Sequence, residues 1–116
     1  MSRYDHTPQP EDIYYTSWGY DQTNVEFFQI TRTTPKSVWL RPISAELYEG
    51  RLHPLPEVTS TDRRLSPNGE EFGPRRITPG QGIRINNRGY IRYAYWYDMT
   101  EDTGRYDTLA AGHAGH

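Results

Sequence analysis

The sequence predicts an all-β fold, a small single-domain β-barrel of the SH3-like or OB-like type. Segments rich in β-branched and aromatic residues recur at short spacing, and turn-forming residues separate them. No segment shows the apolar periodicity of an amphipathic helix. The chain of 116 residues also holds 10 Tyr and 3 Trp, which supply large side chains to a thin core. An open antiparallel sheet with one short helix is the alternative architecture.

Three strands are expected in the first half of the chain, at residues 12–18, 24–33 and 36–43. The second strand has Val25 and Phe27 on one face and Phe28 and Ile30 on the other. Because both faces are apolar, this strand is expected to contain a bulge or to bend at a barrel corner.

Turn signals separate these strands. Thr34–Pro35 is expected to form the turn between the second and third strands. Pro42 favours an edge or an end of the third strand, because proline cannot donate a ladder hydrogen bond. Residues 44–50 are then expected to form one helical turn, which Gly50 ends.

The second half begins with a segment rich in proline and glycine. Residues 51–82 hold five of the nine prolines, so we expect a long loop with short strands at 51–53, 62–66 and 75–78. A hairpin is expected from 83–86 and 90–97, around the Asn and Gly residues of the turn. Residues 1–10 and 108–116 are expected to be a disordered lead-in and a flexible tail, leaving 11–107 as the domain.

Composition excludes several classes of protein. The chain has no Cys, which excludes a disulfide framework and thiolate chemistry. No apolar run reaches the roughly 20 residues of a membrane-spanning helix. The N-terminal segment is polar, unlike a signal peptide. We therefore expect a cytoplasmic protein that makes no membrane contact, as a monomer or a homodimer.

One block of the sequence resembles a known family. Ser17–Phe28, the residues Thr33 and Thr34, and Val38–Ile43 resemble small proteins of bacteriophages, plasmids and their actinobacterial and proteobacterial hosts. The match is weaker over 52–56 and 93–106, and it does not include 57–82. The resemblance implies a phage or mobile-element lineage, and it implies no particular activity.

The same block supplies the first candidate site. Tyr20, Asp21, Gln22 and Asn24 lie between two expected strands, where a polar loop can recognise a partner. The alternative is an Asx-type turn whose side chains satisfy backbone groups while Trp18 packs at the end of the barrel.

The second candidate is a basic window. Between Phe72 and Tyr97 the chain has five arginines and no acidic residue. Interleaved arginines and aromatic rings are typical of surfaces that bind single-stranded nucleic acid. The candidate residues of the 83–97 hairpin are Arg84, Arg88, Tyr90, Arg92 and Trp96. The alternative is that these arginines pair with the acidic segments at 1–21 and 98–107.

No catalytic or metal-binding pattern stands out. His113 and His116 have a spacing that can bind a metal on a helix, but they lie in a tail rich in Gly and Ala. We expect no enzyme activity, no metal and no cofactor. The predicted function is that of a phage or mobile-element accessory protein, which binds a host or phage protein in the bacterial cytoplasm. Binding of single-stranded nucleic acid is the alternative.

Overall fold

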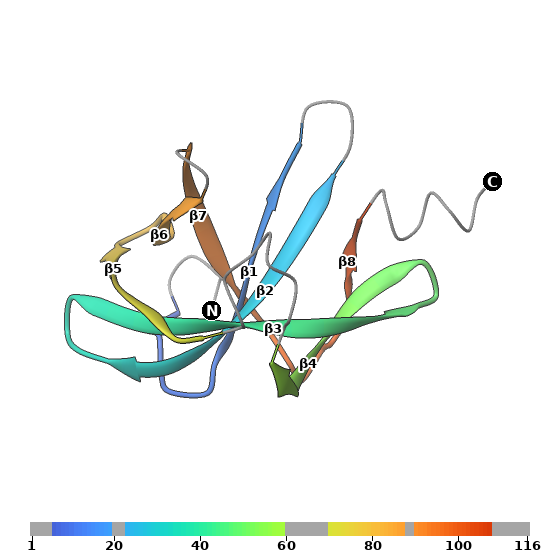
Figure 1. Cartoon of the computed structure of the whole chain (residues 1–116), viewed down its shortest axis with the longest axis horizontal. Helices are drawn as coiled ribbons and strands as arrows, with labels where there is room; N and C mark the ends of the chain where they lie inside the picture. The colour runs from blue at the N-terminus through green and yellow to red at the C-terminus, as the bar shows by residue number, and fades with distance from the viewer. Residues whose placement is uncertain (1–5, 20–22, 60–69, 88–89, 108–116) are drawn as a thin grey trace.

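The protein folds entirely into β-strands in the part of the chain that the structure describes. The structure is a computed structural model of the whole chain, and it describes residues 6–19, 23–59, 70–87 and 90–107. These residues form eight strands and contain no helix, and Figure 1 shows how the strands are arranged. The strands are β1 (Ile13–Trp18), β2 (Asn24–Thr33), β3 (Ser37–Tyr48), β4 (Arg51–Thr59), β5 (Phe72–Thr78), β6 (Gly82–Asn87), β7 (Tyr90–Tyr97) and β8 (Arg105–Tyr106).

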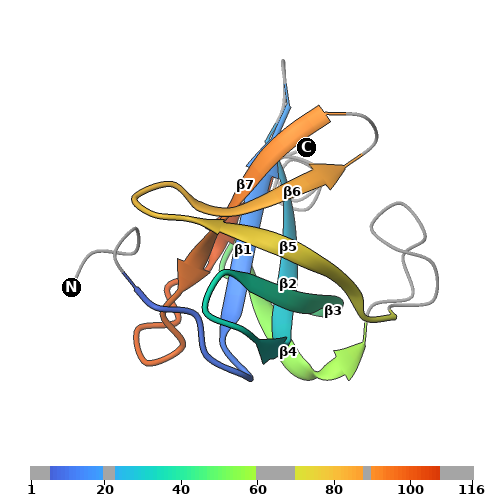
Figure 2. The same cartoon turned by 90° about the vertical axis from the view of Figure 1, so that its left-hand side faces the viewer.

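Six strands close into an antiparallel barrel. Their order is β2-β1-β7-β6-β5-β3, and β3 pairs back with β2. Figure 2 shows β5, β6 and β7 side by side in the barrel wall. Closure gives each of these strands two neighbours, which removes the free edges of an open sheet. The predicted all-β barrel is confirmed, and the alternative of an open sheet with a short helix is wrong.

Strand β3 is longer than the sequence predicts, because it pairs with two different strands along its length. Its first part pairs with β5 up to Leu40, and its second part pairs with β4 from Ile43 onward. Pro42 lies between these two pairings, so the missing N–H falls where the strand changes partner. The helical turn predicted at 44–50 is therefore wrong, since residues 44–48 belong to β3.

A tight turn replaces the predicted helix end. Glu49 and Gly50 have φ angles of 52° and 77° between the paired residues Tyr48 and Arg51. Positive φ at both central residues is the signature of a two-residue hairpin loop whose twist matches the flanking strands. Gly50 thus ends β3 as a hairpin residue.

The segment predicted as a loop contains two full strands. Strands β4 and β5 cover 51–59 and 72–78, so the short strands predicted at 51–53 and 75–78 are present but longer, and the predicted loop is wrong at 54–59 and 72–74. Pro54 and Pro56 follow the two β4 residues that pair with β8, on an edge where a missing N–H is tolerated. The strand predicted at 62–66 lies outside the described residues, and β8 was not predicted.

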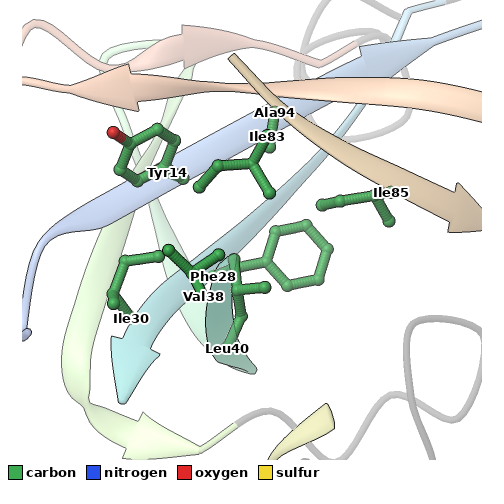
Figure 3. Packing of buried hydrophobic residues seen from close by; sticks show 8 residues of the cluster. All are labelled: Tyr14, Phe28, Ile30, Val38, Leu40, Ile83, Ile85 and Ala94. Carbon is green, nitrogen blue, oxygen red and sulfur yellow. The ribbon is translucent and has the colours of Figure 1, made fainter. Parts of the chain in front are cut away.

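The barrel interior is filled by one apolar cluster. Its members come from five strands and are all almost fully buried: Tyr14, Phe28, Ile30, Val38, Leu40, Ile83, Ile85 and Ala94. Figure 3 shows these side chains converging between the strands. The side chains of Phe72, Ile77 and Trp96 pack against the cluster.

A second cluster lies on the opposite side of the barrel wall. It consists of Ile13, Tyr15, Phe27, Ile43 and Tyr97. The side chains of Ala45 from β3 and Leu52 from β4 pack against it, so the β3–β4 extension covers this wall. The register of β2 also shifts between Ile30 and Arg32. Both the two-sided burial of β2 and its bulge confirm the sequence prediction.

The N-terminal segment is docked on the barrel from His6 onward. The His6 ring stacks on Trp96 with centroids 3.9 Å apart and planes inclined by 7°. His6 Nε2 also lies 2.7 Å from the Asp12 carboxylate, and Pro8 is buried. This part of the 1–10 segment therefore differs from the expected disordered lead-in, because Trp96 offers a ring face. Residues 1–5 and the tail at 108–116 lie outside the described residues.

Replacing His6 with alanine is expected to lower the free energy of unfolding by about 1–2 kcal/mol. This sum combines one stacked ring pair with one hydrogen bond. Urea denaturation measures the loss, and acrylamide quenching reports the newly exposed face of Trp96. Deletion of residues 1–5 is the control and should leave both measurements unchanged. An unchanged quenching rate in the His6→Ala variant would show that the stack does not form in solution.

Candidate functional site

Of the four residues predicted to form a recognition loop between β1 and β2, the structure describes only Asn24, at the end of the loop where β2 begins. Tyr20, Asp21 and Gln22 lie outside the described residues. Asn24 is the first residue of β2, directly opposite Trp18, and its side-chain Nδ2 donates to the Trp18 carbonyl at 3.3 Å. Asn24 thus closes the β1–β2 hairpin, which is the turn role that the alternative interpretation gave to this block.

The end of the barrel next to the β1–β2 loop has polar side chains in its interior. Thr16 and Glu26 lie opposite each other on β1 and β2, and both are buried. The Arg92 guanidinium carbon lies 5.2 Å from the centre of the Trp18 ring. Trp18 is half-buried, in agreement with its predicted position at the end of the barrel. This end therefore combines a cation, a carboxyl group and a large ring within the barrel wall.

The five residues of the predicted nucleic-acid surface do not form one surface. Arg92 lies against Trp18, and Trp96 has one face covered by His6. Arg84 is exposed and lies opposite Tyr93. It is next to the buried Ile85 on β6, so it points to the other face of the strand. Arg88 and the side chain of Tyr90 lie outside the described residues. The barrel wall thus separates Arg84 from Arg92, because alternate residues of a strand point to opposite faces.

A surface that the sequence did not reveal lies where the β3–β4 hairpin meets β8. We name Tyr48, Arg51 and Tyr106 the aromatic tip. Tyr48 lies opposite Arg51, and Arg51 lies opposite Tyr106, so the three side chains form one row across three strands. Tyr48 is 60% exposed and Tyr106 is 51% exposed. Figure 1 shows this hairpin at the far end of the molecule from β5 and β6.

The aromatic tip was missed because both of its tyrosines were assigned to other structures. Tyr48 fell in the predicted helical turn, and Tyr106 fell in a polar segment with no expected strand. A signal for a strand was present in the sequence, because apolar and polar residues alternate from Ala45 onward. In the structure Ala45 faces the second cluster and Glu46 is exposed.

Contacts from the chain after β7 hold the aromatic tip in place. The Tyr97 hydroxyl donates to Asp102 Oδ1 at 2.5 Å and accepts from the Gly104 N–H at 2.8 Å. His53 Nδ1 lies 3.2 Å from the same Asp102 oxygen. The His53 ring meets the Tyr48 ring edge to face, with centroids 5.7 Å apart. A polar cluster thus links the end of β7 to β4 and to one ring of the aromatic tip.

The strand β8 has two further attachments. The Arg105 guanidinium carbon lies 4.3 Å from the centre of the Tyr15 ring, in the second cluster. Asp107 is buried, and its Oδ2 accepts from the Val25 N–H at 2.9 Å. A strand of two residues is too short to be stable alone. These contacts explain why β8 nevertheless keeps Tyr106 beside Arg51.

The electrostatics of the polar cluster favour a structural role. Burial, followed by the hydrogen bond to Asp102, raises the pKa of Tyr97 well above its usual value. The phenol therefore stays protonated at neutral pH and serves as a hydrogen-bond donor. The same hydrogen bond is the main cause that lowers the pKa of Asp102. A charged Asp102 accepting from Tyr97 is the stable arrangement.

The Asp102 contacts predict how stability changes in acid. Because the pKa of Asp102 is lowered in the folded state, the charged carboxylate stabilises the fold. This contribution to the free energy of unfolding is fully present above the usual pKa of aspartate, about 3.9, and is lost as the pH drops through the folded-state pKa. Asp102→Asn keeps an acceptor oxygen but does not titrate. Thermal unfolding midpoints measured below about pH 5 should fall more steeply for the wild type than for Asp102→Asn. Tyr97→Phe should also flatten the wild-type profile. Parallel profiles for all three proteins would contradict this prediction.

Searches for other kinds of site gave no candidate. In the described part of the chain, no three His, Cys, Asp or Glu side chains are grouped as metal ligands. The described residues also contain no helix of the length and apolar character needed to cross a membrane. Comparisons with protein-family models, with curated proteins and with solved structures found no match for this chain.

Proposed function

We propose that this protein is a non-enzymatic binding module whose aromatic tip docks onto another protein. The observation that carries the proposal is the exposed row of Tyr48, Arg51 and Tyr106 across three strands. Tyrosine and arginine are enriched at protein interfaces and at their energetic hot spots. In this proposal the partner is a host or phage protein. The protein acts as a phage or mobile-element accessory factor in the bacterial cytoplasm, which is the lineage that its Ser17–Phe28 block implies.

The geometry of the aromatic tip suits recognition by preformed contacts. A tyrosine ring offers a large contact area and has few rotatable bonds, so little entropy is lost when it is immobilised. The His53 ring already supports Tyr48, and the Asp107 contact with β2 holds the strand that carries Tyr106. Binding therefore needs little reorganisation of these side chains, and this lowers the cost of association.

The loop with Tyr20, Asp21 and Gln22 is a second candidate surface for the same function. It contains the block on which the family resemblance depends, and Asn24 fixes its second end on β2. The side chain of Asn24 serves the hairpin itself, so we assign it to positioning the loop.

Affinity capture with paired variants tests the proposal. Tagged protein is incubated with nuclease-treated lysate of a candidate host, and captured proteins are quantified by mass spectrometry. The double variant Tyr48→Ser/Tyr106→Ser should lose a specific protein by at least about 30-fold, the ratio that corresponds to one hot spot of about 2 kcal/mol. Ile91→Ser is the matched control, because Ile91 is 56% exposed on β7, away from the aromatic tip.

Three outcomes separate the alternatives. Equal loss in Ile91→Ser and in the double variant would contradict a specific role for the aromatic tip. Loss in Tyr20→Ala together with retention in the double variant would move the site to the β1–β2 loop. Sedimentation of the purified protein as a dimer, abolished in the double variant, would identify a second copy as the occupant and overturn the proposal of a host or phage partner.

A further inference from the structure

The outer face of the barrel wall at β5, β6 and β7 carries exposed arginines. Ile77 and Ile83 lie opposite each other, and both pack in the barrel core. Arg76 and Arg84 are the adjacent residues on these two strands, so both point to the outer face, and both are exposed. Tyr93 lies directly opposite Arg84 on the next strand and is half-buried. Figure 2 views the three strands from this side.

This surface, which we name the basic face, is the row of Arg76, Arg84 and Tyr93. Neighbouring strands lie about 4.8 Å apart, so a row across three strands measures roughly 10 Å. The row does not include Arg92 or Trp96, which point to the other side of the wall. It lies on different strands from the aromatic tip.

Within the described part of the chain, acidic residues do not neutralise the basic face. Strands β5, β6 and β7 contain no acidic residue. The ion pairs His6–Asp12, Arg32–Glu71 and His53–Asp102 do not include Arg76 or Arg84. Asp107 accepts from a backbone N–H of β2. Among the described residues, the alternative in which the arginines pair with the protein's own acidic ends therefore finds no support at these two positions.

We propose that the basic face binds single-stranded nucleic acid. Arg76 and Arg84 contact successive phosphates of one strand, and the Tyr93 ring stacks on a base next to them. Charge complementarity selects a polyanion, because two exposed guanidinium groups lie on adjacent strands with no acid among them. The tyrosine selects a single strand, because a duplex keeps the faces of its bases stacked against one another and out of reach. The binding requires no sequence preference, since every base offers a face for stacking.

Fluorescence anisotropy of the full chain tests this proposal. The probe is a fluorescein-labelled oligothymidylate of about 15 nucleotides, near the upper site size of one OB-type barrel. Affinity is measured from about 50 to about 200 mM salt. The logarithm of the affinity should fall linearly with the logarithm of the salt concentration, with a slope near −1.4 for two phosphate contacts.

Variants separate the two kinds of contact. Arg76→Gln and Arg84→Gln should each weaken binding and flatten the slope by about 0.7. Tyr93→Leu should weaken binding by about tenfold and leave the slope unchanged, because it removes stacking and no charge. Arg51→Gln is the matched control, because Arg51 is an exposed arginine of the aromatic tip. It should bind like the wild type. Unfolding midpoints confirm that each variant is folded.

Four results would overturn the proposal. These are no binding at about 50 mM salt, equal slopes in the wild type and both Arg→Gln variants, equal affinity for a duplex of the same length, and equally strong competition by polyglutamate. The last result would identify an acidic protein as the ligand. The variant Tyr48→Ser/Tyr106→Ser should bind the oligonucleotide normally, so failure of the aromatic-tip proposal and failure of this one are distinguishable.

Discussion

Replacing Phe28 with alanine is expected to lower the free energy of unfolding by about 3–5 kcal/mol. Phe28 is 2% exposed in the barrel core, and its ring meets Phe72 edge to face with centroids 5.7 Å apart. Truncation removes this contact and leaves a cavity that the paired strands cannot close. A loss of this size is a large fraction of the stability of an ordinary small domain.

Phe27→Ala is expected to lower the free energy of unfolding by a similar amount, but by weakening a different part of the structure. Phe27 is also 2% exposed, but it belongs to the second cluster and meets Tyr97 edge to face at 5.4 Å. Because β4 packs on this cluster, its loss should release β4 and β8 before the barrel unfolds. Phe28→Ala should instead weaken the barrel strands together, since its cluster has members on five strands and the side chains of Phe72 and Ile77 on the sixth, β5, pack against it.

Urea denaturation and hydrogen exchange distinguish the two routes. Both alanine variants should lose similar total stability, and Phe27→Ala should show faster exchange confined to the amides of β4 and β8. Phe27→Leu and Phe28→Leu are the controls, because they keep most of the apolar volume and should lose far less stability. Uniform exchange in Phe27→Ala would mean that the two clusters unfold as one unit.

The two adjacent phenylalanines also explain what could be predicted from the sequence. A strand with apolar residues on both faces predicted a bulge or a barrel corner, and the structure has both a register shift and two-sided burial in β2. The hairpins around Thr34–Pro35 and 86–89 followed from local turn chemistry. In each case the signal lay within about ten residues, which is the range over which strand and turn patterns are informative.

The errors arose where pairing partners decide the structure. Residues 44–48 are strand because each of them pairs with a residue of β4, and no local propensity reveals that pairing. Pro54 and Pro56 were interpreted as loop residues, although proline is tolerated on the open edge that β4 presents beyond β8. The segment at 54–59 was therefore predicted as a loop and folds as a strand.

The candidate surfaces show the same limit. The excess of arginine in 72–97 was visible in the sequence, but the side of the wall on which each arginine lies depends on the register of β5, β6 and β7. The aromatic tip depends on pairing between Arg51 and Tyr106, which are far apart in the chain. Its exposed tyrosines lie on either side of Arg51 only after the barrel and its extension have formed.

Replacing Gly82 with alanine is expected to destabilise the protein more than the same change at Gly80, in the same turn. Both glycines have positive φ angles, 98° at Gly82 and 77° at Gly80. A positive φ costs a residue with a side chain about 1–2 kcal/mol. The two positions differ in the room available for a side chain. A Cβ at Gly82 would lie 2.3 Å from the Ala94 carbonyl oxygen, whereas nothing lies within 4 Å of a Cβ at Gly80.

The close contact at Gly82 involves the backbone of a paired strand, so it has little freedom to relax. Ala94 is paired with Ile83, and moving its carbonyl away separates β6 from β7 in the barrel wall. Gly82→Ala should therefore lose a further 1–3 kcal/mol or so from overpacking, which makes about 2–5 kcal/mol in total, while Gly80→Ala loses only the 1–2 kcal/mol or so of the positive φ angle. Urea denaturation of both variants measures the difference. Equal losses would show that β6 and β7 separate at this turn without cost, and the barrel wall would then be open at the end where Gly82 joins β6.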